Sequence, residues 1–232
     1  MTVKGVLFDF SGTLFRIESA GSWLRAALAE TGHEWSEEEL ARTARELESA
    51  GALPGGAKPS VPVPAHLDAV WAARDRSAAE HRAAFTGLSQ LVSLPGPGLH
   101  DALYERHMAP AAWTPYADAA DVLGALRERG VAVGVVSNIG WDLRPVFREH
   151  GLDRYVSAYV LSYEHGVQKP DARLFAIACS ALGVAPEDTL MVGDDRRADG
   201  GAAALGCAVH FVDPLPVADR PDGLRAVLGL AD

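Results

Sequence analysis

The chain has 232 residues, of which 48% are hydrophobic and 22% are charged, and its formal net charge is −10 at pH 7. This length and composition suffice for one large domain, or for one domain with an insert. No long Lys/Arg block occurs, which argues against nucleic-acid binding because neutralising phosphates needs clustered cations. No apolar run could span a bilayer and no signal pattern precedes the first predicted strand, so we expect a cytoplasmic protein without a membrane partner.

The first half of the chain combines one predicted strand with a long helical region. Residues 3–8 form an apolar run that ends in Asp9 and a Gly-Thr turn, which predicts a buried strand. The following segment, 16–113, lacks strand patterns and is rich in Ala, Glu, Arg and Leu at helical spacing. Within it we expect helices over 37–48 and 66–85, separated by a loop rich in Gly and Pro. The pattern predicts a helical insert after the first strand.

The rest of the chain alternates strand and helix patterns. Continuous apolar runs predict further strands, buried on both faces, at 131–136, 189–192 and 208–212. Helical periodicity with a terminating glycine predicts helices over 117–129 and 172–182. This alternation predicts an α/β fold built on a doubly wound parallel sheet.

Each of the first three predicted strands ends in polar side chains. Asp9 follows the first, Ser137 and Asn138 follow the second, and Asp194 and Asp195 follow the third. Because the carboxyl ends of parallel strands meet at one edge of a sheet, we expect these side chains to converge.

The converging residue types suit phosphoryl transfer. A Mg²⁺ ion held by Asp9 and Asp194 would screen a carboxylate nucleophile from a phosphate dianion. Lys169, which stands just before a predicted helix, would add a compact positive charge for the phosphoryl oxygens. The hydroxyl of Thr13 or Ser137 could donate a hydrogen bond to the transferring group. Any one of these residues alone is more often a turn or surface residue, but their order at successive strand ends favours a site.

Four segments resemble the motifs of the haloacid dehalogenase superfamily of hydrolases. They are the Asp-Phe-Ser-Gly-Thr run at 9–13, the Ser-Asn pair at 137–138, the Lys-Pro-Asp run at 169–171, and the stretch from Gly193 to Asp199. The resemblance covers residues 3–15 and about 113–213. It implies a Rossmann-like core of residues 1–15 and 114–232 with a helical cap of residues 16–113.

The resemblance also implies a covalent mechanism with a magnesium cofactor. Asp9 would be the nucleophile and would form an aspartyl intermediate that water hydrolyses. Mg²⁺ would be bound by the carboxylate of Asp9, the backbone carbonyl of Ser11 and the carboxylate of Asp194. Asp195 and Asp199 would support the metal through water or outer hydrogen bonds. The cap would open and close over a small phosphorylated substrate.

Ser11 departs from the family pattern, in which phosphatases carry a second aspartate at this position as general acid and base. A hydroxyl cannot protonate a leaving alkoxide as a carboxylic acid can, and such help is typically worth ~10²–10⁴-fold. Three functions therefore stay open: a phosphatase, a 2-haloacid dehalogenase-type hydrolase, and a catalytically weakened relative that binds a ligand or regulates. If another group supplies the proton, the cap histidines His33 and His66, or a metal-polarised water, are candidates.

The acidic fourth motif favours the phosphatase over the dehalogenase, which stays the second candidate. Dehalogenating relatives tend to lack an acidic metal site, whereas this chain retains Asp194, Asp195 and Asp199. Phosphonate-cleaving relatives use a cap lysine, but Lys58 stands in a loop rich in Pro and Gly, a poor place for a buried amine of lowered pKa. The sequence therefore predicts a Mg²⁺-dependent hydrolase of a small phosphate ester, acting as a monomer or homodimer.

Overall fold

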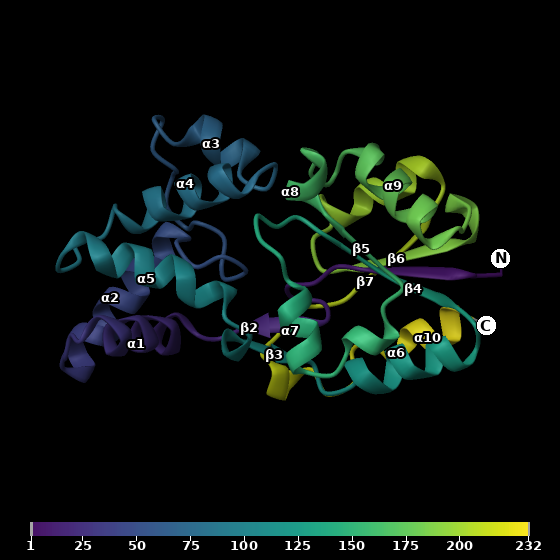
Figure 1. The fold of residues 1–232 in the computed structure, drawn as a ribbon, viewed down its shortest axis with the longest axis horizontal. Coiled ribbons are helices and arrows are strands. Elements are labelled where there is room, and N and C mark those ends of the chain that lie inside the picture. Colours follow the sequence, from purple (N-terminus) through teal and green to yellow (C-terminus); the bar gives the residue numbers. More distant parts are fainter. Residues whose placement is uncertain (1, 232) are drawn as a thin grey trace.

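The structure is a computed structural model that describes residues 2–231, apart from the side chain of Pro97. Figure 1 shows two groups of elements, a helical group on one side and a sheet covered by helices on the other. None of the helices in residues 2–231 is long and apolar enough to cross a membrane.

A five-stranded parallel sheet forms the centre of the larger group. Its strands, in the order in which they lie, are β5 (Ala158–Leu161), β4 (Ala132–Ser137), β1 (Gly5–Phe8), β6 (Thr189–Gly193) and β7 (Ala208–Phe211). In the register of β1, Phe8 lies opposite Val135 of β4 and Val192 of β6. The predicted α/β fold with a parallel sheet is confirmed.

Most strands differ from the prediction in their bounds, and the hairpin strands at 15–17 and 113–115 were not predicted. β5 was not predicted either; it is a four-residue strand at the edge of the sheet, and its first two residues are only partly buried. β4 begins and ends one residue later than the apolar run suggested, so Ser137 is the last residue of the strand. Hydrogen bonding to the neighbouring strands decides where each strand ends. The apolar pattern in the sequence locates these ends only approximately.

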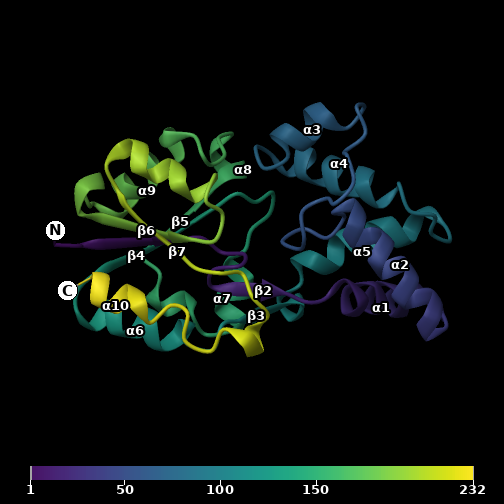
Figure 2. The same ribbon diagram turned by 180° about the vertical axis from the view of Figure 1, so that it is seen from behind.

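Helices cover both faces of this sheet (Figures 1 and 2). One face carries α6 (Ala119–Glu128), α7 (Arg144–Glu149) and α10 (Ala226–Leu230), and the other carries α8 (Ser162–His165) and α9 (Ala172–Leu182). Short 3₁₀ helices lie at η1 (Pro110–Ala112), η2 (Asp153–Tyr155), η3 (Pro186–Asp188), η4 (Asp199–Leu205) and η5 (Val217–Asp219). Because neighbouring strand residues point to opposite faces, Leu7 packs in the cluster around α9 while Val6 and Phe8 pack in the other cluster.

The smaller group consists of five helices. They are α1 (Ala20–Thr31), α2 (Glu37–Ala50), α3 (Asp68–Ala73), α4 (Ala78–Ser89) and α5 (Pro97–Met108). The single helix predicted over 66–85 is wrong, since the chain breaks it between α3 and α4. Ser77 starts α4 because its side chain accepts a hydrogen bond from the N–H of Glu80 at 3.1 Å, a strong N-terminal cap. The break places Arg74 and Asp75 on the side of this helical group that lines the cavity next to the sheet group.

The chain crosses between the two groups through a small antiparallel hairpin. Strand β2 (Phe15–Ile17) pairs with β3 (Trp113–Pro115), so the segment that leads from the sheet group to the helical group lies beside the segment that returns. The predicted boundaries between core and cap fall within this hairpin. The division into a core of residues 1–15 and 114–232 and a cap of residues 16–113 stays a prediction. Below, "cap" denotes the helical group and its loops.

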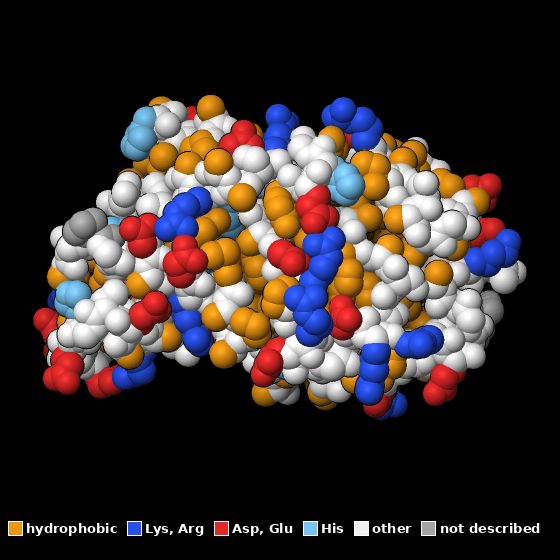
Figure 3. Space-filling model, viewed as in Figure 1, with side chains coloured by type: hydrophobic (Ala, Val, Ile, Leu, Met, Phe, Trp, Pro, Cys, Tyr) orange, Lys and Arg blue, Asp and Glu red, His pale blue; other side chains and the backbone are white. Residues whose placement is uncertain are grey.

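One surface view locates charge on the molecule. In Figure 3, acidic and basic side chains are interspersed across the face, and hydrophobic side chains are visible in the middle, between the cap and the sheet group. Over α7 and α8, Arg144 contacts both Asp142 and Glu164 at 3.0 and 2.8 Å. Such exposed pairs contribute little to stability.

Arg220 ties the end of the chain to the turn that follows β1. Its guanidinium donates to the carbonyl oxygens of Gly12 at 2.7 Å and Asp213 at 2.9 Å, and also to that of Thr13. The residue is 5% exposed. Because the turn carries the residues directly after Asp9, this buried clamp fixes the shape of the loop beside the strand ends.

Replacing Arg220 by methionine tests this clamp. Arg220→Met keeps most of the side-chain volume but leaves three carbonyls without their charged donor, so the free energy of unfolding should fall by about 3 kcal/mol. Urea denaturation measures the change. Arg225→Met is the control, because Arg225 is exposed and lies 4.0 Å from its partner Asp121. Equal stability of both variants would contradict the structural role.

Candidate active site

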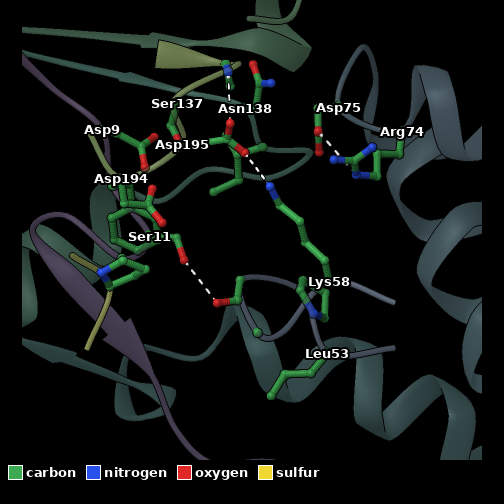
Figure 4. A pocket seen from close by; sticks show the side chains of 18 of the residues that line it. Asp9, Ser11, Leu53, Lys58, Arg74, Asp75, Ser137, Asn138, Asp194 and Asp195 are labelled. Atoms are coloured by element: carbon green, nitrogen blue, oxygen red, sulfur yellow. Dashed lines mark hydrogen bonds and ion pairs between the residues drawn. The ribbon is translucent and has the colours of Figure 1, made fainter. Parts of the chain in front are cut away.

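Three strand ends meet at one edge of the sheet. Asp9 directly follows β1, and its N–H donates to the carbonyl of Val192 at 2.9 Å, which extends the pairing with β6 by one residue. Asp194 directly follows β6, and Ser137 ends β4. All three side chains line a cavity of about 470 Å³ between the sheet and the cap (Figure 4). The convergence expected from the parallel topology is present.

Lys169 lies at the floor of this cavity, and its ammonium joins two carboxylates. It donates to Oδ1 of Asp9 at 2.7 Å, to Oδ1 of Asp199 at 2.6 Å and to the carbonyl of Val136 at 3.1 Å. Burial lowers the pKa of Lys169, but the carboxylates of Asp199 and Asp9 outweigh it and raise the pKa above its ordinary value. The lysine therefore stays charged inside the protein.

Asn138 holds Lys169 in place. The amide nitrogen of Asn138 donates to the backbone carbonyl of Lys169 at 3.0 Å, and the backbone N–H of Lys169 donates to the amide oxygen at 2.6 Å. A side-chain amide has one donor and one acceptor group, and here both bind the same residue. Asn138 therefore positions Lys169.

Asp199 is fixed by the loop that follows β6. Its Oδ2 accepts a hydrogen bond from the N–H of Asp195 at 2.9 Å, and its Oδ1 accepts from Lys169. This position of the Asp199 carboxylate requires a residue without a side chain at 193, because a Cβ on Gly193 would lie 2.1 Å from Oδ2 of Asp199. A glycine at 193 is thus a condition for burying this carboxylate beside the sheet.

The carboxylates of Asp9, Asp194 and Asp199 form a cluster. One oxygen from each lies within 4.8 Å of the others. Burial, followed by repulsion from Asp199 and Asp194, raises the pKa of Asp9 to about 7, although Lys169 opposes the shift. Burial and repulsion from Asp199 likewise raise the pKa of Asp194 to about 6. When all are ionised, three carboxylates and one ammonium leave two negative charges, which fits a divalent cation with oxygen ligands.

Asp195 does not join this cluster. Its Oδ2 accepts from Nζ of Lys58 in the cap at 2.7 Å, and its Oδ1 accepts from the N–H groups of Arg197 and Ala198 at 2.9 and 3.0 Å. Partial burial alone would raise the pKa of Asp195, but the hydrogen bonds from Lys58 and the backbone lower it to about 2. Figure 4 shows Lys58 reaching across the cavity from its loop. The sequence predicted no contact between Lys58 and Asp195, and Lys58 was considered there only as a buried amine of lowered pKa.

Of the two hydroxyl residues in the turn after β1, Ser11 lines the cavity and Thr13 does not. Ser11 lines the cavity, and its Oγ donates to the carbonyl of Gly55 in the cap loop at 3.2 Å. The Thr13 side chain is fully buried and does not line the cavity, and its Oγ1 has no hydrogen-bond partner among the described residues. Thr13 therefore does not face the space where a transferring group would lie, whereas Ser137 does.

The cap contributes side chains that the sequence did not single out as site residues. His33 lies beside a separate hollow between α1 and α2, and His66 does not line the cavity. The cavity is instead lined from the cap by Leu53, Lys58, Trp71, Arg74, Asp75, His81 and Phe85. The Ser-x-x-Glu pattern at 77–80 could have revealed the helix break that presents Arg74 and Asp75.

Comparison with known proteins assigns the chain to a family. A model of the haloacid dehalogenase-like hydrolases matches residues 3–206. The chain belongs to this family. The haloacid dehalogenase-like resemblance seen in the four motifs is thereby confirmed, together with the classification as a hydrolase.

The family member is similar to proteins of different activities. It is 40% identical over 100 residues to a phosphoserine phosphatase of Thermus thermophilus, covering 42% of this chain and 40% of that protein. It is 32% identical over 111 residues to (S)-2-haloacid dehalogenase 4A of Burkholderia cepacia, covering 47% and 46%. The chain therefore matches less than half the length of these two relatives. The hydrolase YfnB of Bacillus subtilis, solved bound to magnesium, superposes with a TM-score of 0.69 at 16% identity, covering 100% and 99% of the chains, which shows a shared fold.

Removing the Lys169 charge should destabilise the protein. Lys169→Met leaves the buried carboxylates of Asp9 and Asp199 without a counter-charge, at a cost of about 3–5 kcal/mol of unfolding free energy in metal-free buffer. A carboxylate whose pKa is raised on folding binds protons more tightly when folded, so acidification favours the folded state. Because the pKa of Asp9 is already about 7 beside the lysine, the loss should be smaller at pH 5 than at pH 8.

Urea denaturation at the two pH values measures this loss. The control is Lys4→Met, since Lys4 pairs with Asp188 on the surface with 63% of its side chain exposed, and its stability should be nearly unchanged. A Lys169→Met variant as stable as Lys4→Met at pH 8 would contradict the buried ion-pair interpretation.

Proposed function

We propose that the protein is a Mg²⁺-dependent hydrolase that removes the phosphoryl group from a small phosphate ester through an aspartyl-phosphate intermediate at Asp9. The observation that carries the proposal is the cluster of the Asp9, Asp194 and Asp199 carboxylates, in which the ammonium of Lys169 contacts Asp9 and Asp199 and is one positive charge against three carboxylates. A halide-releasing reaction has no dianion to screen and no use for such a site. The phosphatase-named relative supports the same substrate class.

Asp9 is proposed as the nucleophile. A carboxylate oxygen of Asp9 attacks phosphorus, the ester bond breaks, and the leaving oxygen takes the electron pair. Lys169, held by Asn138, offsets the repulsion between the Asp9 carboxylate and the phosphoryl oxygens. The hydroxyl of Ser137, at the end of β4, faces the same cavity and can donate to a phosphoryl oxygen.

The oxygen atoms of this site suit a magnesium ion, which prefers carboxylate and carbonyl ligands. The carboxylates of Asp9 and Asp194, with the backbone carbonyl of Ser11, would hold it, and Asp199 and Asp195 would support the site from behind. When bound, the ion supplies positive charge that stabilises the phosphoryl group during transfer. The proposal includes a monomer or homodimer acting on a free small molecule that enters the cavity between cap and sheet.

A dehalogenase is the second candidate, because one relative of this chain has that name and because Ser11 cannot act as a carboxylic acid. In that reaction Asp9 would attack carbon and release halide, which leaves without a proton. A catalytically weakened ligand-binding protein is the third candidate. The retained carboxylate cluster and Lys169 weigh against both.

The nucleophile is tested by an isosteric substitution. Asp9→Asn should reduce turnover of an aryl phosphate to background, because the amide cannot form the aspartyl intermediate, while leaving the fold intact. Steady-state hydrolysis of 4-nitrophenyl phosphate measures turnover, and circular dichroism checks the fold. Activity within a few-fold of the unmodified protein would exclude Asp9 as nucleophile.

Metal dependence separates the candidate functions. Chelation should abolish hydrolysis of phosphate esters, because without a cation the negative charge of the carboxylate cluster repels the phosphoryl group. Added Mg²⁺ should restore hydrolysis by compensating that charge. A parallel assay follows halide release from (S)-2-chloropropionate. Metal-independent halide release, with no phosphate release, would replace the phosphatase proposal with the dehalogenase. Inactivity on both substrate classes would favour the ligand-binding alternative.

A further inference from the structure

The proposed phosphatase reaction, on which this inference rests, needs a proton donor. Breaking the P–O bond of an alkyl ester releases an alkoxide, which leaves slowly until it is protonated. Ser11, two residues after the nucleophile, carries a hydroxyl that is too weak an acid for this step. Its Oγ also lies against the cap loop, where it donates to Gly55. A Cβ on Gly55 would come within 2.9 Å of that Oγ, so the loop packs tightly over Ser11.

Most ionisable side chains of the cavity are unsuited to carry the proton. Asp9, Asp194 and Asp199 belong to the carboxylate cluster. Asp195 is held in its charged form by Lys58 and by backbone N–H groups. The lysines and arginines of the cavity stay protonated at neutral pH, because their ordinary pKa values are far higher.

His81 is unsuited for a different reason. It is buried in the cap, and burial lowers its pKa well below the ordinary value, so that the ring is neutral near pH 7. Its Nδ1 lies 2.8 Å from the hydroxyl of Tyr104, which fixes the ring inside the cap. Asp75 is the remaining acidic side chain among the described residues that line the cavity.

Asp75 has the surroundings of a proton-carrying carboxyl group. It lies in the break between α3 and α4 and is only 4% exposed. The nearest basic groups to its carboxylate are Nε of Arg74 at 3.5 Å and Nε2 of the neutral His81 ring at 4.0 Å, and no residue in the described part of the chain donates a hydrogen bond to it. Burial raises the pKa of Asp75, with Arg74 and Lys169 opposing the shift.

The backbone of Asp75 is fixed to the segments that carry the active site. Oγ of Ser162 donates to the carbonyl of Asp75 at 2.5 Å and accepts from the N–H of Ile139 at 2.9 Å. The side chain of Gln168 donates to the carbonyl of Ala72 at 2.9 Å. Ile139 directly follows the Ser-Asn pair after β4, and Gln168 directly precedes the buried lysine. These bonds hold the backbone of Asp75 beside the segment that follows Ser137 and Asn138, and Figure 4 shows Asp75 next to Arg74 on the cap side of the cavity.

We propose that Asp75 is the general acid and base of this enzyme, supplied from the cap in place of the residue at position 11. As an Asp9 oxygen bonds to phosphorus and the ester bond breaks, the carboxyl proton of Asp75 passes to the leaving oxygen, which becomes the alcohol. A water oxygen then bonds to phosphorus, the Asp9–phosphorus bond breaks, and a water proton returns to the Asp75 carboxylate. The products are the alcohol and inorganic phosphate, and both aspartates are restored.

Leaving-group dependence tests this role. In Asp75→Asn, kcat/KM for ethyl phosphate should fall by ~10²-fold or more, whereas kcat/KM for 4-nitrophenyl phosphate should fall less than about fivefold, because nitrophenolate leaves without a proton. The retained aryl activity also reports that the fold and the Asp9 site are intact. Asp68→Asn, from the exposed first turn of α3, is the control and should leave both values unchanged.

The pH profile provides a second readout. In the unmodified protein, kcat/KM for ethyl phosphate should decline with rising pH as Asp75 loses its proton, and this limb should be absent in Asp75→Asn and displaced in Asp75→Glu. Equal losses on both esters in Asp75→Asn, with identical pH profiles for Asp75→Glu and the unmodified protein, would overturn the inference alone. An unmodified protein that hydrolyses neither ester in Mg²⁺ would instead overturn the proposed function.

Discussion

The buried ammonium of Lys169 is the interaction on which the rest of the site depends. Two carboxylates, Asp9 and Asp199, lie within 2.7 Å of it at the carboxyl edge of the sheet. Without a cation there, burying them so close together would carry a large desolvation and repulsion cost. The lysine permits two acidic residues to occupy a nearly dry position, and a third, Asp194, leaves the cluster with a net negative charge.

Several local features exist to hold that arrangement. Asn138 binds the backbone of Lys169 through both ends of its amide. Gly193 leaves room for the Asp199 carboxylate, and the Arg220 guanidinium holds the turn after Asp9 by its carbonyl oxygens. Each of these acts on a neighbour of the reacting groups, and together they restrict the geometry as preorganised sites require.

The cap and the sheet group contact each other at the sides of the cavity. Lys58 pairs with Asp195 on one side, and Ser162 and Gln168 bind cap carbonyls on the other. The two groups also pack directly, since the ring of His107 in α5 lies 5.6 Å from that of Trp141 and a Cβ on Gly140 would meet His81. The cap contributes side chains such as Asp75 to the cavity, and its opening to admit a substrate stays a prediction.

The sequence by itself determined the fold class and most of the floor of the site. Strand-length apolar runs followed by Asp9, Ser137 and Asp194 imply one converging edge, because parallel topology brings carboxyl ends together whatever the loops do. The order of these residues was also sufficient to recognise the haloacid dehalogenase-like family. Local patterns specify such features because each depends on residues close in the chain.

Only the tertiary structure decided which side chains face the cavity and which serve other partners. Asp195 pairs with Lys58, 137 residues away, a contact that the sequence did not predict, and its support of a metal stays a prediction. Of the two hydroxyls expected to donate to the transferring group, Ser137 lines the cavity, whereas Thr13 is fully buried and does not. Asp75 drew no notice, because its role depends on a helix break and on contacts with Ser162. Pairing between distant segments is set by packing and by the desolvation of buried charges, and neither leaves a periodic signal in the chain.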